Sequence, residues 1–259
     1  MRLRHAGRSH TGLVRVNNED AWFGDDGVGL YIVCDGVGGR ARGEVASEVT
    51  VEHIRDWITG EAELLGRARE AGAQLDDALI ARLQAMVRSA VQNACYMVHA
   101  MGELDPDQHG MSTTATVLVA VGGRGIVGQV GDSRVYRSRP GDGGASVSQL
   151  TEDHTLVWQQ VQSGRMTPEQ ARTSRLKNII TRAVGQKAHV EVDTFVVDLR
   201  PGDRILLCTD GLHDYLDRGL DVGALFACDL DEAAAAAVRE ANARGGADNI
   251  TALFVELSA

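Results

Sequence analysis

The chain has 259 residues, of which 44% are hydrophobic and 24% charged, with a formal net charge of −10. This composition suits a globular fold with a large core, and no stretch reaches the roughly 20 apolar residues of a membrane span. The negative charge and the lack of a basic block argue against nucleic acid or anionic membranes as partners. The four cysteines form no CxxC pair and the first ten residues hold no apolar signal core, so we expect a cytoplasmic protein.

The first part of the chain predicts strands followed by helices. Short strands are expected at residues 3–6, 21–24 and 29–34, and residues 36–39 are expected to form a turn. Apolar residues at helical spacing predict a helix at 43–58 and a long helix at 76–101. The charged segment 61–74 between them is either a loop or a frayed helix.

The second part of the chain is mostly strands. They are expected at residues 113–121, 125–130, 133–138, 190–198, 204–209 and 249–257. A short helix is predicted near 156–163, and a helix containing the alanine run 233–237 is predicted to begin with a capping box of Asp229 and Glu232. Strands that follow one another as meanders predict antiparallel sheets packed together with helices outside, an α+β layered fold. No linker or repeat divides residues 1–259, so a single domain is expected.

Two strongly apolar runs, GLYIVC and RILLCT, end at Asp35-Gly36 and Asp210-Gly211. Each run predicts a buried strand that delivers a carboxylate to the edge of a sheet and then turns. Further acidic motifs lie at Glu19-Asp20 and Asp248-Asn249. Carboxylates about 4 Å apart repel by about 4 kcal/mol at an effective dielectric near 20, so a shared space must be filled by protons or cations. The pattern therefore indicates a polynuclear metal site.

Each motif also has an ordinary structural interpretation. A lone Asp-Gly pair is usually a turn, and Asp26 and Asp142 are assigned to that class. Arg15, shortly before Glu19-Asp20, is either part of a surface ion pair or a phosphate ligand beside carboxylates that hold metal-bound water. Spacing alone does not decide between these alternatives.

The motifs occur in a characteristic order: RVNNED, VCDGVGG, MSTTATV, VGDSRVYR, ITRAVG, LLCTDGLHD and ADNIT. This ordered set resembles the metal-dependent protein serine/threonine phosphatases of the protein phosphatase 2C (PPM) family, in their compact bacterial form. The resemblance runs from about Arg8 to the C-terminus. It implies an αββα sandwich, in which two antiparallel β-sheets are flanked by helices, with a flap-like insertion at about 151–185.

The resemblance also implies a set of metal ligands. Asp35 would bridge two metal ions, and the carbonyl group of Gly36 would bind one of them. Asp210 and Asp248 would complete the set of ligands of the second ion, and Asp132 would join Asp210 in holding a possible third ion. Oxygen ligands of this kind suit Mn²⁺ or Mg²⁺.

Other residues receive supporting roles from the resemblance. Glu19 and Asp20 would orient metal-bound water, and Arg15 would bind the substrate phosphate. Arg40 is a second candidate for substrate binding. Val37 stands where many eukaryotic members carry a histidine proposed as the general acid, so the leaving group would take its proton from another source.

The implied reaction is hydrolysis of phosphoserine or phosphothreonine in proteins by a metal-activated water. The implied partners are phosphoprotein substrates and a cognate serine/threonine kinase, and the chain is expected to act as a monomer. Two rival hypotheses are a two-metal nuclease, which the charge of −10 disfavours, and a catalytically silent domain of the same fold. The silent domain would be expected to lack one of four residues that are all present: Arg15, Asp35, Asp210 and Asp248.

Overall fold

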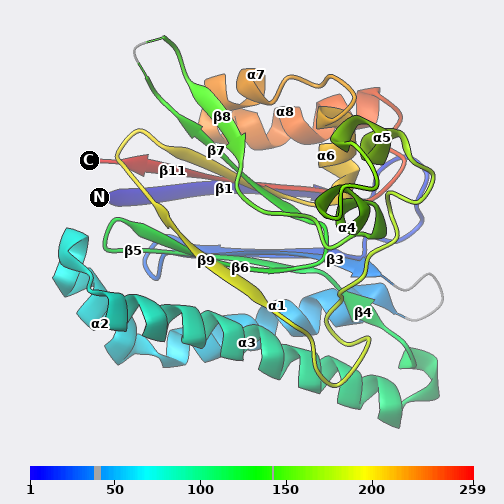
Figure 1. Ribbon diagram of the computed structural model, residues 1–259, viewed down its shortest axis with the longest axis horizontal. Coiled ribbons are helices and arrows are strands. Elements are labelled where there is room, and N and C mark those ends of the chain that lie inside the picture. The colour runs from blue at the N-terminus through cyan, green and yellow to red at the C-terminus, as the bar shows by residue number, and fades with distance from the viewer. Residues whose placement is uncertain (38–41, 142) are drawn as a thin grey trace.

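The computed structural model describes residues 1–37, 42–141 and 143–259. Its strands form two antiparallel sheets that pack face to face, with helices on both outer sides (Figure 1). The first sheet has the strand order β1 (Arg2–His10), β11 (Ile250–Ser258), β10 (Arg204–Cys208), β7 (Arg134–Arg139), β8 (Ser146–Gln149). The second sheet has the order β2 (Asp20–Asp25), β3 (Leu30–Val37), β5 (Ala115–Val121), β6 (Arg124–Val130), β9 (Asp193–Asp198), and β4 (Ser112–Thr113) pairs with β3. The predicted αββα sandwich is confirmed.

The helices divide between the two outer faces. The second sheet is covered by α1 (Gly43–Gly60), α2 (Ala62–Ala71) and α3 (Asp77–Leu104). The first sheet is covered by α6 (Asp210–Leu216), α7 (Val222–Ala227) and α8 (Leu230–Ala243). Between β8 and β9 lie α4 (Leu156–Gln162) and α5 (Pro168–Thr173), and two 3₁₀ turns follow α2 and α3, at Gly72–Gln74 and Pro106–Gln108. No helix in the described ranges is long and apolar enough to cross a membrane.

Strand β3 shows why its sequence is a continuous apolar run. Alternate side chains of a strand point to opposite faces of its sheet. Leu30, Ile32 and Cys34 pack against α1 and α3, whereas Tyr31 and Val33 pack between the two sheets. Both faces of the strand are buried, and an apolar residue is therefore favoured at every position. The same alternation places the next residue, Asp35, on the side that faces the first sheet.

The structure corrects several predictions of local structure. Asp35 and Gly36 lie within β3, and Asp210-Gly211 begins α6, so neither pair is itself a turn. Residues 38 and 39 of the turn expected at 36–39 lie outside the described residues. The segment 61–74, left open between a loop and a frayed helix, contains the regular helix α2. Asp229 is the N-cap of α8, but its side chain accepts no hydrogen bond, so the predicted capping box is wrong. Strand β8 and the short helices α5, α6 and α7 were not predicted.

Candidate metal centre

Most of the predicted carboxylates line one cavity of about 230 Å³, which lies at one end of the space between the sheets. Asp35 reaches it from β3, and Asp210 reaches it from the start of α6, directly after β10. Asp132 comes from the loop between β6 and β7, and Asp248 comes from the residues just before β11. The cavity is also lined by Arg15, Glu19, Gly36, Val37, Asn178 and Ile180.

Asp35 is a partly buried carboxylate of this cavity. Burial raises its pKa well above the ordinary value, and the negative charges of Asp20 and Asp210 raise it further. Within the described residues no hydrogen-bond donor reaches its carboxylate oxygens, whereas its backbone is fixed by bonds with Thr113 and Thr114. A buried carboxylate without donors is unfavourable unless a proton or a cation compensates it.

Asp20 lies behind Asp35, in the facing position on β2. One of its oxygens accepts hydrogen bonds from the hydroxyl groups of Thr209 and Thr251, at 2.9 and 2.6 Å. Its other oxygen is buried and has no partner within the described residues. Burial raises the pKa of Asp20 to about 7. The side chain is thus held firmly by one oxygen, while the other remains free to accept a hydrogen bond from water.

The position of Asp210 depends on a close approach of two backbone segments. A Cβ atom on Gly211 would overlap the backbone oxygen of Asn249, so only glycine lets α6 begin this near to β11. This contact brings Asp210 and Asp248 into one cavity. Burial raises the pKa of Asp210 to about 7, with further contributions from the charges of Asp248 and Asp214.

Arg15 is held at the cavity by Asp248, because its guanidinium donates to that carboxylate at 2.6 Å. The loop that carries Arg15 is fixed by Asn249. The Asn249 side-chain amide donates to the backbone oxygens of Thr11 and Asn17, and its side-chain oxygen accepts from the backbone N–H of Glu19. One asparagine therefore places both Arg15 and Glu19 beside Asp248, just before β11, and Asp210, at the start of α6. The motif ADNIT contained this residue, but its sequence context did not reveal the role.

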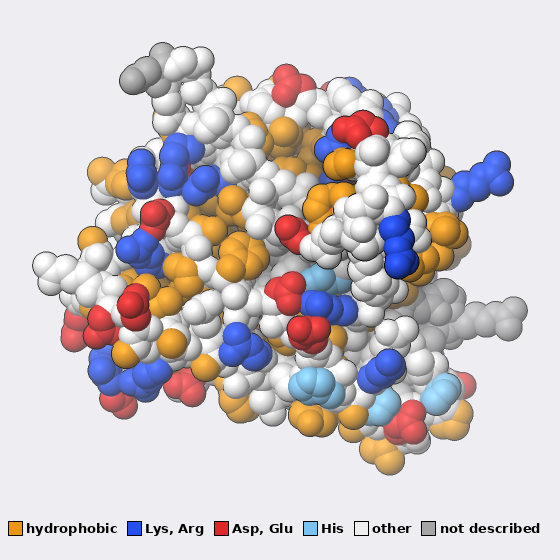
Figure 2. All heavy atoms as spheres, in the orientation of Figure 1, with side chains coloured by type: hydrophobic (Ala, Val, Ile, Leu, Met, Phe, Trp, Pro, Cys, Tyr) orange, Lys and Arg blue, Asp and Glu red, His pale blue; other side chains and the backbone are white. Residues whose placement is uncertain are grey.

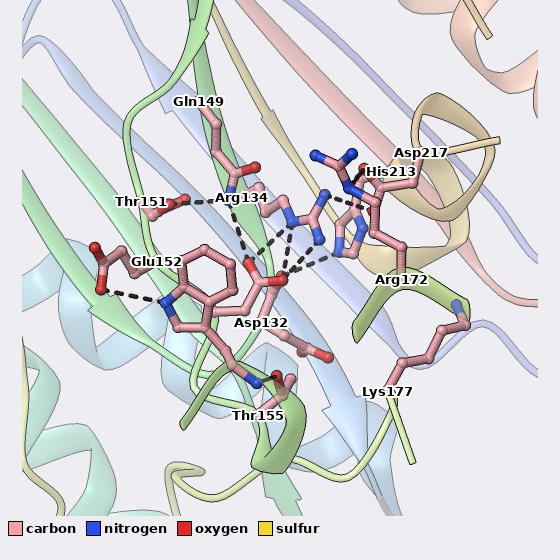
Figure 3. Close-up of polar contacts among 12 residues, drawn as sticks. Asp132, Arg134, Gln149, Thr151, Glu152, Thr155, Arg172, Lys177, His213 and Asp217 are labelled. Carbon is pink, nitrogen blue, oxygen red and sulfur yellow. Dashed lines mark hydrogen bonds and ion pairs between the residues drawn. The ribbon is translucent and has the colours of Figure 1, made fainter. Parts of the chain in front are cut away.

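Two buried histidines, His154 and His213, support the turn that carries Asp132, and Figure 3 shows His213 beside it. Gly131, directly before Asp132, has a positive φ of +98°. The backbone N–H of Gly131 donates to Nδ1 of His154 at 3.1 Å. His213 donates from Nε2 to the backbone oxygen of Asp132 at 3.0 Å. Burial lowers the pKa of His213 well below its ordinary value and also lowers that of His154, so both rings are neutral near pH 7. Both histidines thus position backbone atoms.

A larger cavity of about 460 Å³ adjoins the first and shares Asp132, Asn178 and Asp210 with it. On its floor, the buried Arg134 guanidinium donates to Asp153 and Asp217, at 2.7 and 3.0 Å (Figure 3). The carboxylates satisfy the buried cation and fix the wall between β7 and the flap-like segment. Sequence patterns could not identify this cluster, because its members are far apart in the chain.

The residue types at the smaller cavity fit a hard divalent cation. All the acidic groups supply oxygen, the donor that Mg²⁺ and Mn²⁺ prefer, and no cysteine or histidine lines the described walls. In the described residues, no three acidic, histidine or cysteine side chains converge closely enough to form a ready-made metal site. The raised pKa values of Asp20, Asp35, Asp132 and Asp210 show that like charge and burial oppose such convergence in the absence of a cation.

The structure therefore brings together nearly all the residues that the sequence singled out. Arg15, Glu19, Asp35, Gly36 and the three distant aspartates line one cavity, and Asp20 supports it from behind. Arg40 lies outside the described residues, as does Asp142, which was assigned to a turn. Asn178 lines both cavities and was not predicted.

Comparison with known proteins identifies the class. A family model described as protein phosphatase 2C matches residues 6–243. The serine/threonine protein phosphatase PstP of Mycobacterium tuberculosis is 35% identical over 260 residues, which cover 98% of this chain and 45% of PstP. The chain thus spans about half the length of that relative. The serine/threonine phosphatase stp of Listeria welshimeri is 34% identical over 254 residues, covering 96% of this chain and 94% of stp.

Solved structures similar to this chain belong to the same class of phosphatases. The crystal structure of the M. tuberculosis phosphatase PstP/Ppp has a TM-score of 0.85, with 34% identity and full coverage of both chains. The catalytic domain of PstP in complex with two manganese ions has a TM-score of 0.76 and 32% identity, over 100% of this chain and 99% of that one. The chain belongs to the protein phosphatase 2C family, whose known structures include this manganese complex.

Proposed function

We propose that this chain is a metal-dependent protein phosphatase that hydrolyses phosphoserine and phosphothreonine. The observation that carries the proposal is the position of Arg15, whose guanidinium lies against Asp248 in a cavity whose other charged lining residues are all acidic. A metal site alone needs no such cation. A planar guanidinium beside metal-binding carboxylates is suited to a phosphate group, which it can contact through two hydrogen bonds. The names of the relatives support the same activity.

The ligand assignment follows from the cavity. Asp35, the Gly36 carbonyl, Asp210 and Asp248 would hold two ions of Mn²⁺ or Mg²⁺, and Asp132 with Asp210 would hold a third. Bound there, the ions would lower the pKa of a coordinated water and offset negative charge on the phosphoryl oxygens. The manganese complex of PstP supports Mn²⁺ as one suitable metal.

The remaining residues would bind the substrate phosphate, orient water and stabilise negative charge on the phosphate oxygens. Arg15 would donate to the non-bridging phosphate oxygens and stabilise the charge that they carry as the bond to the leaving oxygen breaks. Asp20, held by Thr209 and Thr251, would accept a hydrogen bond from a water through its unpartnered oxygen and so fix the direction of that water. Glu19 would act in the same way from the cavity wall. Arg40 is retained as a proposed substrate contact on the basis of its sequence position alone.

Other expectations accompany this function. We infer one phosphatase domain over 1–259, in which 151–185 forms a flap beside the cavity, and a cognate serine/threonine kinase that produces the substrates. A monomer in the cytoplasm stays a prediction of the sequence. The rival nuclease lacks support on the face in Figure 2, where basic side chains are dispersed among acidic and hydrophobic ones rather than aligned.

The direct test is hydrolysis of a phosphothreonine peptide with and without Mn²⁺. We expect activity that needs the metal and is lost in Asp35→Asn, while Asp56→Asn, on the exposed side of α1, keeps the wild-type rate. Equal rates for wild type and Asp35→Asn would contradict the mechanism. Hydrolysis of single-stranded nucleic acid at a rate similar to that of the peptide would favour the nuclease.

A further inference from the structure

Three large hydrophobic side chains are exposed directly beside Arg15. Leu13, Val14 and Val16 are 65%, 68% and 94% exposed, and the residue between them lines the metal cavity. A single exposed apolar side chain is ordinary on a protein surface. Several that are adjacent and border a cavity form a patch, and such patches mark binding surfaces.

A second segment borders the same cavity from the flap-like region. Leu176 and Ile179 are exposed, and the neighbouring Asn178 and Ile180 line the cavity. Together, Leu13, Val14, Val16, Leu176 and Ile179 are named the apolar rim. They come from two distant parts of the chain, and each part contains residues that line the cavity with the carboxylates, Arg15 in the first and Asn178 and Ile180 in the second.

The backbone of the first rim segment is held in place. The N–H of Leu13 donates to the backbone oxygen of Gly246 at 2.7 Å, and Asn249 binds the oxygens of Thr11 and Asn17 on either side. Val14 and Val16 are therefore displayed to solvent by a loop anchored before and after them. A surface that is already ordered loses little conformational freedom on binding, which favours a binding role.

The second rim segment is also anchored. The N–H of Leu156 donates to the oxygen of Ile179 at 2.9 Å, and Ile180 forms a β-bridge with Thr155. Lys177, between the two exposed residues, pairs with Asp214 on α6. The exposed side chains thus lie on a fixed backbone in both segments.

We propose that the apolar rim binds apolar side chains that flank the phosphorylated residue of a protein substrate. This inference rests on the proposed phosphatase function. A phosphate that enters the cavity of about 230 Å³ leaves the residues before and after it outside the cavity, close to the exposed rim residues that adjoin Arg15 and Asn178 in the chain. Acidic flanks would meet the carboxylates of the cavity and be repelled, whereas apolar flanks would cover exposed valine, leucine and isoleucine.

The test compares three substrates in the presence of Mn²⁺: p-nitrophenyl phosphate, a phosphothreonine peptide flanked by valine and leucine, and the same peptide flanked by serine and glycine. Wild type is expected to prefer the apolar peptide by about tenfold in kcat/KM, mainly through KM. Combining Val14→Ser with Val16→Ser should abolish most of this preference, and so should Leu176→Ser with Ile179→Ser. Neither pair should change the hydrolysis of p-nitrophenyl phosphate, which is too small to reach the rim.

The matched control combines Met97→Ser with Leu104→Ser. Both side chains are exposed on α3, outside the cavity, and Leu104 is 85% exposed. This variant should retain the wild-type preference. An equal kcat/KM for both peptides in wild type, or an equal loss in the control, would overturn the proposal.

Binding without turnover separates the rim from the proposed activity. With EDTA present, fluorescence anisotropy should show weaker binding of the labelled apolar peptide to the Val14→Ser/Val16→Ser variant than to wild type, whether or not any ester is hydrolysed. Unchanged binding would contradict the proposal. Sedimentation velocity tests whether a second copy of the chain covers the apolar rim instead of a substrate. A wild-type dimer that the Val14→Ser/Val16→Ser variant converts to monomers would overturn the proposal that the rim binds substrate. A monomer in both cases would support that proposal.

Discussion

Asp20 and Asp35 occupy facing positions on the paired strands β2 and β3. Directly opposed residues of an antiparallel pair place their side chains on the same face of the sheet. Both carboxylates are partly buried, and burial together with the charge of Asp20 raises the pKa of Asp35 well above its ordinary value. The fold therefore holds two acidic groups in a position that is unfavourable for the protein without metal and useful only when a cation is present.

Asp35→Asn is expected to stabilise the metal-free protein. Asparagine keeps the size of the side chain and removes the buried charge, so the free energy of unfolding near pH 7.5 should rise by about 1–3 kcal/mol. The measurement is urea unfolding with EDTA, followed by calorimetric titration with Mn²⁺, where the variant should bind more weakly. Asp56→Asn should change the unfolding free energy by less than about 0.5 kcal/mol. A destabilised Asp35→Asn protein would show that the carboxylate makes favourable contacts.

The stability of the metal-free protein should fall as the pH rises from about 4 to about 7. Burial raises the pKa of Asp20 and of Asp210 to about 7 in the folded state, above the ordinary value of 3.8. Between these values the folded protein binds more protons than the unfolded chain, so loss of protons favours unfolding. Thermal unfolding in EDTA across this range tests the sign. Saturating Mn²⁺ should reduce the decline, because the cation replaces the protons.

Arg15→Ala should lower kcat/KM for a phosphothreonine peptide by about 100-fold, because the phosphate oxygens lose a charged donor. Arg15→Lys should recover only part of the loss, since an ammonium group cannot form the two parallel hydrogen bonds of a guanidinium. Arg15 is half-exposed, so neither change should alter the unfolding temperature appreciably. Arg67→Ala, on the exposed side of α2, should keep full activity. Complete rescue by lysine would indicate that charge alone matters.

Gly211→Ala should destabilise the protein by about 2–3 kcal/mol and weaken Mn²⁺ binding, because the added methyl group would overlap Asn249 and separate Asp210 from Asp248. Gly66→Ala offers a matched control. Gly66 lies inside α2, and nothing lies within 4 Å of the position that its Cβ would take. That change should stabilise the protein by about 0.5–1 kcal/mol. Circular dichroism melts of the two variants would establish whether the two alanines act in opposite directions.

The sequence predicted the fold where local pattern and burial agree. GLYIVC is apolar at every position because β3 is buried on both faces, and the long helix α3 has a continuous apolar stripe. Prediction failed where tertiary contacts override local chemistry. Asp210-Gly211 has the composition of a turn, but the glycine serves the approach of Asn249 and allows α6 to begin. Strand β8 is short and partly exposed, so it carries no apolar run.

At the site, the ordered motifs were sufficient to identify the candidate metal ligands. They did not identify the residues that hold those ligands and Arg15 in place through hydrogen bonds. Asn249, which holds the Arg15 loop, contacts residues more than 200 positions earlier in the chain. The hydroxyl groups of Thr209 and Thr251 likewise bind Asp20 from 189 and 231 positions away in the chain. Contacts of this range depend on how two sheets pack, and neither residue type nor periodicity along one strand reveals them.

The pairing of β1 with β11 constrains the order in which the fold and its metal cavity can form. Residues 2–10 pair along their whole length with residues 250–258, and Asp248 precedes that last strand directly. A nascent chain that has emerged only as far as residue 200 already contains Arg15 and Asp35 but lacks both the partner of β1 and two of the aspartates. Such long-range pairing forms slowly and leaves β1 as an unpaired edge in the meantime. A fragment that ends before residue 248 therefore lacks part of the cavity lining, and β1 has no pairing partner until residues 250–258 have been made.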